Sequence, residues 1–130
     1  MLSKLSTAAA AALISLASSA AMAGAGDYAF EPVNPEMKKS EDVTIAVRLT
    51  NKTTGKPVAD AVIFKTRVDM APDGMAEMES PVAPVPSKEP GVYAFKTELP
   101  MAGRYQLSLS AKVQGEPETV TGSVVIKANK

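Results

Sequence analysis

Apolar and polar residues alternate along most of this chain with a period of two, which is typical of β-strands that bury one face. Five stretches show the alternation most clearly, at residues 43–50, 58–68, 92–99, 104–113 and 120–126. Clusters rich in glycine, proline, asparagine or threonine separate them, as expected for turns and loops. The pattern therefore predicts a series of short strands, with no helix after the first 23 residues.

Two further segments predict weaker strands at the edges of sheets. Residues 24–35 begin loosely and then place Tyr28 and Phe30 on one face, before two prolines end the strand. Residues 80–86 are rich in proline and can form at best a ragged edge strand, because proline cannot donate to the hydrogen-bond ladder. The total of six to seven strands predicts an all-β fold, an immunoglobulin-like antiparallel β-sandwich, since a sheet with one apolar face must bury that face against another.

The core is expected from the inward members of each alternating row. These are Val43, Ile45, Val47, Leu49, Val62, Phe64, Thr66, Val68, Tyr93, Phe95, Thr97, Leu99, Tyr105, Leu107, Leu109, Ala111, Val113, Val120, Val124 and Ile126. Gly103-x-Tyr105-x-Leu107 also has the spacing of the tyrosine corner of immunoglobulin-like domains, whose hydroxyl bonds back to the backbone. The alternative is that Tyr105 is an ordinary aromatic residue at a strand end. Gly122 interrupts the last strand and predicts a bulge or a thin point.

The stretch at residues 69–86 lies between alternating runs and holds Met70, Met75 and Met78. Neither the helix nor the strand period fits its first half, so we expect a long, proline-stiffened connection, and connections often carry function on β-scaffolds. Residues 71–74, Ala-Pro-Asp-Gly, have good turn chemistry. A tight turn there would bring Met70 and Met75 opposite one another, with Cβ atoms about 5 Å apart if the flanks pair.

Composition removes several classes of site. The sequence has no cysteine and no histidine, which excludes disulfides, Ser-His-Asp and Cys-His nucleophile systems, and the usual His or Cys sites for zinc and Cu(II). Basic and acidic side chains balance at 14 each, without a basic stripe, so a nucleic-acid partner is not expected. Glu77 and Glu79 lie on one loop and lack the framing of a glycosidase pair. We therefore expect no enzymatic activity and no catalytic residues.

The first 23 residues predict a signal peptide that is cleaved. A short segment with one lysine precedes an apolar, alanine-rich run at residues 8–21, and Ala21-Met22-Ala23 is a small-x-small cleavage site. A membrane anchor is the competing interpretation, but the run is too short and too rich in alanine and serine for one. We expect a single mature domain of residues 24–130 that is periplasmic or secreted.

Two motifs give the chain a resemblance to a known family. Pro90-Gly91-x-Tyr93 is followed by Leu99-Pro100-Met101-Ala102-Gly103-x-Tyr105, and both come after the methionine stretch. Over residues 41–127 the chain resembles the YtkA-like domain, which is related to the periplasmic part of FixH-type proteins. The resemblance implies an immunoglobulin-like sandwich outside the cytoplasmic membrane, associated with heavy-metal efflux or with assembly of copper-dependent respiratory oxidases. It implies no catalytic residues, and this chain lacks the histidine that relatives often place among the loop methionines.

The methionines suggest two functions from different classes. A thioether is neutral and soft and does not titrate, so clustered methionines suit Cu(I) where thiols would be oxidised. The first hypothesis is a site for Cu(I) or another soft metal, used for efflux or for delivery to an oxidase, with candidate ligands Met70, Met75, Met78 and Met101. The alternative is a metal-free periplasmic interaction module, in which sheet edges or the methionine loop contact a partner protein or membrane complex.

Overall fold

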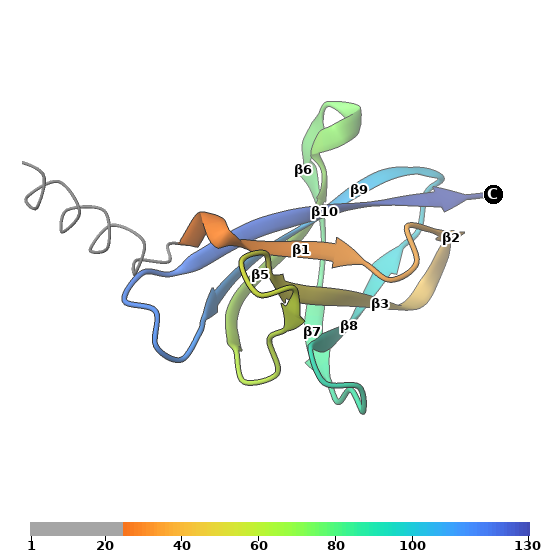
Figure 1. Ribbon diagram of the computed structural model, residues 1–130. Helices are drawn as coiled ribbons and strands as arrows, with labels where there is room; N and C mark the ends of the chain where they lie inside the picture. The colour runs from red at the N-terminus through yellow and green to blue at the C-terminus, as the bar shows by residue number, and fades with distance from the viewer. Residues whose placement is uncertain (1–24) are drawn as a thin grey trace, which may run out of the picture.

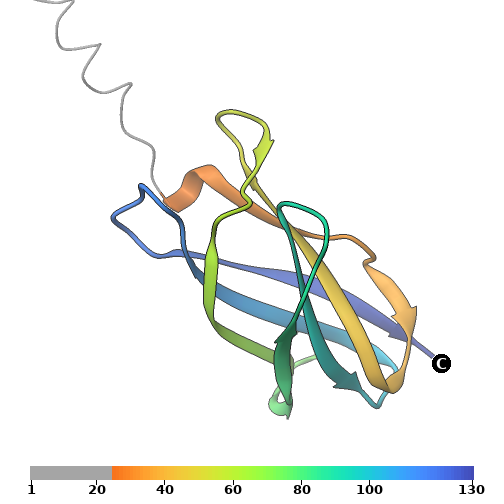
Figure 2. The same cartoon turned by 90° about the horizontal axis from the view of Figure 1, so that it is seen from below.

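Two five-stranded sheets pack face to face in the computed structural model, which describes residues 25–130 (Figures 1 and 2). The segment expected to be a signal peptide lies outside the described residues. One core cluster takes buried side chains from both sheets, including Val47 and Phe95 from one and Leu107 and Ile126 from the other. The molecule is therefore a β-sandwich with its core between the two layers.

The first sheet has the order β1-β3-β8-β7, with β4 paired to the end of β3, and all of its pairs are antiparallel. The second sheet has the order β2-β10-β9-β5-β6, and only the short β2–β10 pair is parallel. The elements are η2 (Ala25–Asp27), β1 (Tyr28–Pro32), β2 (Glu36–Lys38), β3 (Ser40–Asn51), β4 (Lys56–Pro57), β5 (Val62–Met70), η3 (Ala71–Asp73), β6 (Met75–Ser80), β7 (Val82–Val85), β8 (Val92–Leu99), β9 (Gly103–Lys112) and β10 (Val120–Asn129).

This strand order is that of an immunoglobulin-like sandwich. In that fold the first, second, fifth and fourth main strands form one sheet, and the third, sixth and seventh form the other. The strands β1, β3, β8 and β7 occupy the first set of places, and β5, β9 and β10 occupy the second. The predicted fold class is confirmed, although residues 25–130 form ten strands rather than six to seven, because β2, β4 and β6 are additional short segments.

The predicted inward row of β9 is confirmed without exception. Tyr105, Leu107, Leu109, Ala111 and Val113 are all buried. Inward rows on β3, β8 and β10 are confirmed by the buried residues Ile45, Val47, Leu49, Phe95, Thr97, Leu99, Val120, Val124 and Ile126. The clean alternation of these strands therefore reports their buried face correctly.

The prediction for the start of β5 is wrong. Val62 and Phe64 were expected in the core but are 63% and 51% exposed. The pairing of β5 with β9 shifts between Ile63 and Lys65, so Phe64 is an extra residue at a β-bulge. The bulge reverses which residues face inward, and Ile63 packs against the core in place of its neighbours.

The expectation of a long connection at residues 69–86 is also wrong, because this segment contains strands β6 and β7. The turn at its start is confirmed: η3 ends at Gly74, whose φ of 76° is left-handed and whose N–H donates to the carbonyl of Ala71. Met70 and Met75 are Cα partners across this hairpin, as predicted. The weak edge strand predicted at residues 80–86 corresponds to β7.

Gly122 is a thin point rather than a bulge. The β9–β10 register runs past it without a shift, and a Cβ at this position would lie 2.5 Å from Cδ2 of Phe30. The missing side chain lets the Phe30 ring of β1 cover β10, so the first sheet closes onto the second along this edge. No helix within residues 25–130 is long and apolar enough to cross a membrane.

Candidate functional site

A small cavity of about 180 Å³ lies between the β5–β6 hairpin and the turn that joins β8 to β9. Its walls come from the end of β5, from β6, and from the turn between β8 and β9. The lining residues are Met70, Glu77, Met78, Glu79, Ser80, Pro100, Met101 and Tyr105. Three of the four candidate ligands therefore line one cavity, although they come from three separate segments of the chain.

Met70 forms the inner wall of this cavity. It is the last residue of β5 and is 1% exposed, so it also belongs to the hydrophobic core. A Cβ on Gly103 would lie 2.7 Å from the Met70 methyl carbon and 2.7 Å from a carboxylate oxygen of Asp73. Gly103 therefore allows β9 to begin directly beside Met70, which fixes the thioether in place.

Met101 lies in the β8–β9 turn and is held by the tyrosine corner. The hydroxyl of Tyr105 accepts a hydrogen bond from the Met101 N–H and donates one to the Met101 carbonyl. Tyr105 is 2% exposed, so this contact anchors the turn to the core. The tyrosine-corner interpretation of Gly103-x-Tyr105 is confirmed, and it places Met101 at the cavity.

Met78 forms the outer wall from β6, and its side chain is exposed. The neighbouring Glu79 forms an ion pair with Arg67 at 3.1 Å, and the Arg67 guanidinium also donates a hydrogen bond to the Ala76 carbonyl at 2.8 Å. The guanidinium therefore clamps β6 onto β5 although few residues of the two strands pair. This clamp positions Met78 opposite the turn that carries Met101.

Met75 is separate from the other three methionines. It faces Met70 across the hairpin in the Cα register, but it does not line the cavity. Its half-buried side chain packs against the core cluster instead. Register pairing therefore brings Met75 near Met70 without adding its sulfur to the cavity lining.

Two carboxylates stabilise the hairpin beneath the cavity. Burial raises the pKa of Asp69, but hydrogen bonds from Arg67 and from the Ala71 N–H outweigh burial, and the net pKa is lowered. The Asp73 carboxylate accepts one hydrogen bond from the backbone N–H of Arg104 and one from its guanidinium, each at 2.8 Å. Both bonds lower the pKa of Asp73, the backbone one more strongly. Both groups are therefore held as carboxylates that join the turn to β5 and β9.

The chemistry of this cavity is that of soft thioether donors. Within the described residues no three histidine, cysteine, aspartate or glutamate side chains gather in a way that could hold a metal ion. The cavity instead combines Met70, Met78 and Met101 with the exposed carboxylates of Glu77 and Glu79. Thioethers favour Cu(I) over harder divalent ions. Tyr105 also lines the cavity, and the sequence indicates it only through its corner motif and not as a site residue.

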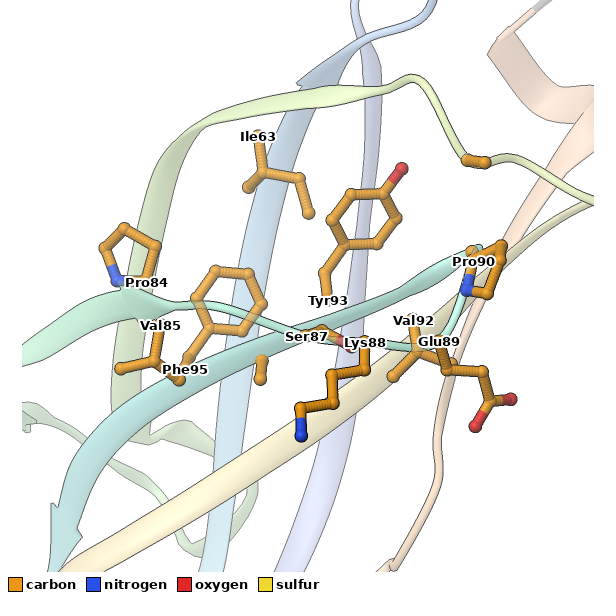
Figure 3. A pocket seen from close by; sticks show the side chains of 13 residues that line it. Ile63, Pro84, Val85, Ser87, Lys88, Glu89, Pro90, Val92, Tyr93 and Phe95 are labelled. Atoms are coloured by element: carbon orange, nitrogen blue, oxygen red, sulfur yellow. The ribbon is translucent and has the colours of Figure 1, made fainter.

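A larger cavity of about 430 Å³ lies elsewhere, between the start of β5 and the β7–β8 hairpin (Figure 3). The side chains around it are mainly apolar and include Ile63, Val85, Tyr93 and Phe95. None of the four candidate methionines is among its lining residues. This cavity is therefore distinct from the methionine site.

Comparisons with known proteins give one family match. Residues 22–110 match the model of a family described as YtkA-like, a span that begins and ends earlier than the expected resemblance. The comparison with curated proteins gives no match.

The solved structures that are similar to this chain include the following three. It is 16% identical to the ZirS C-terminal domain, with 81% of this chain and 67% of that one covered and a TM-score of 0.46. It is 18% identical to the Lin-41 filamin domain, with 75% of this chain and 91% of that one covered and a TM-score of 0.42. It is 14% identical to the adhesin InvE of Yersinia pseudotuberculosis, with 81% of this chain and 27% of that one covered and a TM-score of 0.45. The assignment as immunoglobulin-like rests on the strand order and the tyrosine corner rather than on these likenesses.

Proposed function

Because the chain belongs to the YtkA-like family, we propose that it is a small exported β-sandwich domain that binds Cu(I) or a similar soft ion. Met70, Met78 and Met101 are the proposed ligands. The observation that carries the proposal is their convergence on one cavity from β5, β6 and the β8–β9 turn. Three neutral thioethers at one place form a donor set suited to a soft monovalent metal.

The arrangement also suits capture and release of a metal ion. Met70 is buried and fixed, whereas Met78 and Met101 are 43% and 42% exposed. An ion arriving from solvent would first meet the two outer thioethers and then the inner one. Exposed ligands favour exchange with a partner, so the proposed role is metal handling for efflux or for delivery to a respiratory oxidase outside the cytoplasm.

Cu(I) titration of the purified mature protein tests this proposal, under anaerobic reducing conditions against a coloured Cu(I) chelator. We expect about one equivalent to bind, and no comparable affinity for Zn(II), which prefers ligands that this chain lacks. The variant with Met78→Leu and Met101→Leu keeps the apolar volume nearly constant and should lose Cu(I) binding while retaining the β-sheet signal in circular dichroism.

Two outcomes contradict the proposal. If the double variant binds Cu(I) as tightly as the parent, these side chains are not the ligands. If the parent itself does not compete with the chelator, the protein has no Cu(I) site, and the metal-free interaction module becomes the favoured function.

A further inference from the structure

The first part of β5 has a free edge. This strand pairs with β9 from Val62 to Asp69, but β6 joins its other side only from Val68 onward. Along residues 62–67, no strand of the described chain hydrogen-bonds to the edge that faces away from β9. A free edge presents backbone N–H and C=O groups that can pair with another extended chain.

The larger cavity lies directly beside this edge (Figure 3). Ile63 reaches it from β5, Val85 reaches it from the edge strand β7, and the rings of Tyr93 and Phe95 line it from β8. Its volume of about 430 Å³ suits several apolar side chains. The cavity is therefore a groove between the edge of one sheet and the edge of the other, with these apolar side chains on its walls.

Tyr93 holds this groove open at one end. Its hydroxyl donates to the Val58 carbonyl at 2.6 Å and accepts from the Ala61 N–H at 3.1 Å. These bonds tie the segment that precedes β5 to the opposite sheet. The groove is consequently formed before any ligand binds, which lowers the entropic cost of binding.

Apolar side chains also lie on the solvent side of the same edge. Val62 and Phe64 are exposed on β5, and the Lys112 ammonium lies 5.8 Å from the centre of the Phe64 ring. Cross-strand neighbours on an added strand would cover these side chains, as paired residues do within a sheet. The start of the edge, at residues 62–64, is thus apolar on the outer side as well as on the groove side.

The mouth of the groove carries a positive charge. Its lining includes Lys88 and Glu89, and Glu89 forms an ion pair with Arg48 at 3.3 Å. That pairing leaves the Lys88 ammonium as the charge a ligand would meet there. An acidic side chain complements it.

We propose that this groove binds an extended peptide segment of a partner protein, which adds to β5 as an antiparallel or parallel strand. The free edge of residues 62–67 accommodates about six residues, or roughly 20 Å of extended chain. Alternate side chains of the segment are apolar and enter the groove, and an acidic residue lies near Lys88. The proposal is independent of Cu(I) binding, because the two cavities share no lining residue.

The test begins with a random peptide library displayed on phage and selected against the purified mature protein. We expect the selected peptides to alternate apolar and other residues and to carry an acidic residue. Amide hydrogen exchange is then measured with and without one synthetic selected peptide. Exchange at residues 62–67 should slow by about tenfold or more on binding, because edge amides become hydrogen-bonded.

Two pairs of variants locate the binding site. Ala59 is exposed and lines the groove, so Ala59→Trp should fill its mouth and weaken peptide binding by about tenfold or more. Ala83→Trp is the matched control, since Ala83 is also exposed but lines a different cavity. Lys88→Glu should weaken binding about threefold to tenfold, whereas Lys52→Glu makes the same charge change in another turn and should not.

Several results would overturn the proposal. They are a failure to select any peptide, slowed exchange only at other segments such as β2 or β6, and equal affinity of Ala59→Trp and its control. Binding of a small apolar dye in the groove without any peptide binding would also overturn it, because the groove would then be a small-molecule pocket. If Ala59→Trp fails to fold, the exchange pattern and the Lys88→Glu pair decide the question.

Discussion

The hydroxyl of Tyr105 bonds to both backbone polar groups of Met101, accepting from its N–H at 3.1 Å and donating to its carbonyl at 2.9 Å. One residue thus serves the fold and the candidate site together. The tyrosine corner joins the two sheets where β8 turns into β9, and the same turn carries an outer wall of the methionine cavity. Any loosening of the corner should therefore affect both stability and metal affinity.

Replacing Tyr105 with Phe removes this hydroxyl while keeping the ring in the core. We expect the free energy of unfolding to fall by about 1–3 kcal/mol, because backbone groups of Met101 lose their partner at a part-buried contact. Urea unfolding followed by circular dichroism measures the change. Tyr28→Phe is the control, since the Tyr28 hydroxyl donates to the Glu116 side chain rather than to the backbone, and it should cost less than half as much. Equal losses in the two variants would contradict a special role for the corner.

Leu107 tests the assignment of the inward face of β9. It is 1% exposed and pairs with Val68 and Val124 on the neighbouring strands. Leu107→Ala should lower the free energy of unfolding by about 2–5 kcal/mol through lost burial and a new cavity. Val125→Ala on the outer face of β10 should change it by no more than about 0.5 kcal/mol. A loss below that value for Leu107 would show that the register is wrong.

Most of the fold follows from the sequence because strand periodicity is a local property. The inward residues of β3, β9 and β10 keep a single parity along each strand, so the parity of a residue reveals its face. On β5 the bulge at Phe64 adds one residue to one strand only, and no local pattern reports how many residues the neighbouring strand contributes. Residue parity therefore predicts Val62 and Phe64 in the core, where the structure has Ile63.

The candidate site was predictable only in part. The turn at residues 71–74 and the pairing of Met70 with Met75 follow from local turn chemistry. Strand β6 has no regular alternation because it is an exposed edge strand, in which Ser80 alone is buried. The position of Met101 relative to Met70 and Met78 depends on how two separate turns meet in space, and sequence spacing carries no information on that.

Acidification should destabilise the protein through Asp69. The pKa of Asp69 is lowered in the folded state, so its carboxylate adds stability at pH values above the unfolded value of about 3.9. That contribution is lost as the pH falls through the lower pKa of the folded state. The difference in unfolding free energy between the parent and Asp69→Asn should therefore be greatest above about pH 5 and should shrink below about pH 4. A difference that stays constant across this range would contradict the lowered pKa.

Export is tested by the N-terminus of the protein recovered from producing cells. We expect mass spectrometry to find a chain that begins at Gly24, because Ala21-Met22-Ala23 is a small-x-small cleavage site. The protein should fractionate with extracytoplasmic proteins. An intact N-terminus in the membrane fraction would show that the first 23 residues anchor the chain instead.

The last prediction separates the two methionines of strand β6, Met75 and Met78. Met78 lines the methionine cavity, whereas Met75 packs against the core. Met78→Leu should therefore weaken Cu(I) binding by about tenfold or more through loss of a thioether, while Met75→Leu should leave it within about twofold of the parent. Both substitutions conserve apolar volume, so each should change the unfolding free energy by less than about 1.5 kcal/mol. Competition against a Cu(I) chelator gives the affinities, and urea unfolding checks the fold.

The opposite ranking would be equally informative. If Met75→Leu abolishes Cu(I) binding and Met78→Leu does not, the metal lies on the core side of the hairpin, where Met70 and Met75 face each other in the register. The cavity lined by Met70, Met78 and Met101 would then not be the metal site. Cα pairing alone would have located the ligands better than the cavity does.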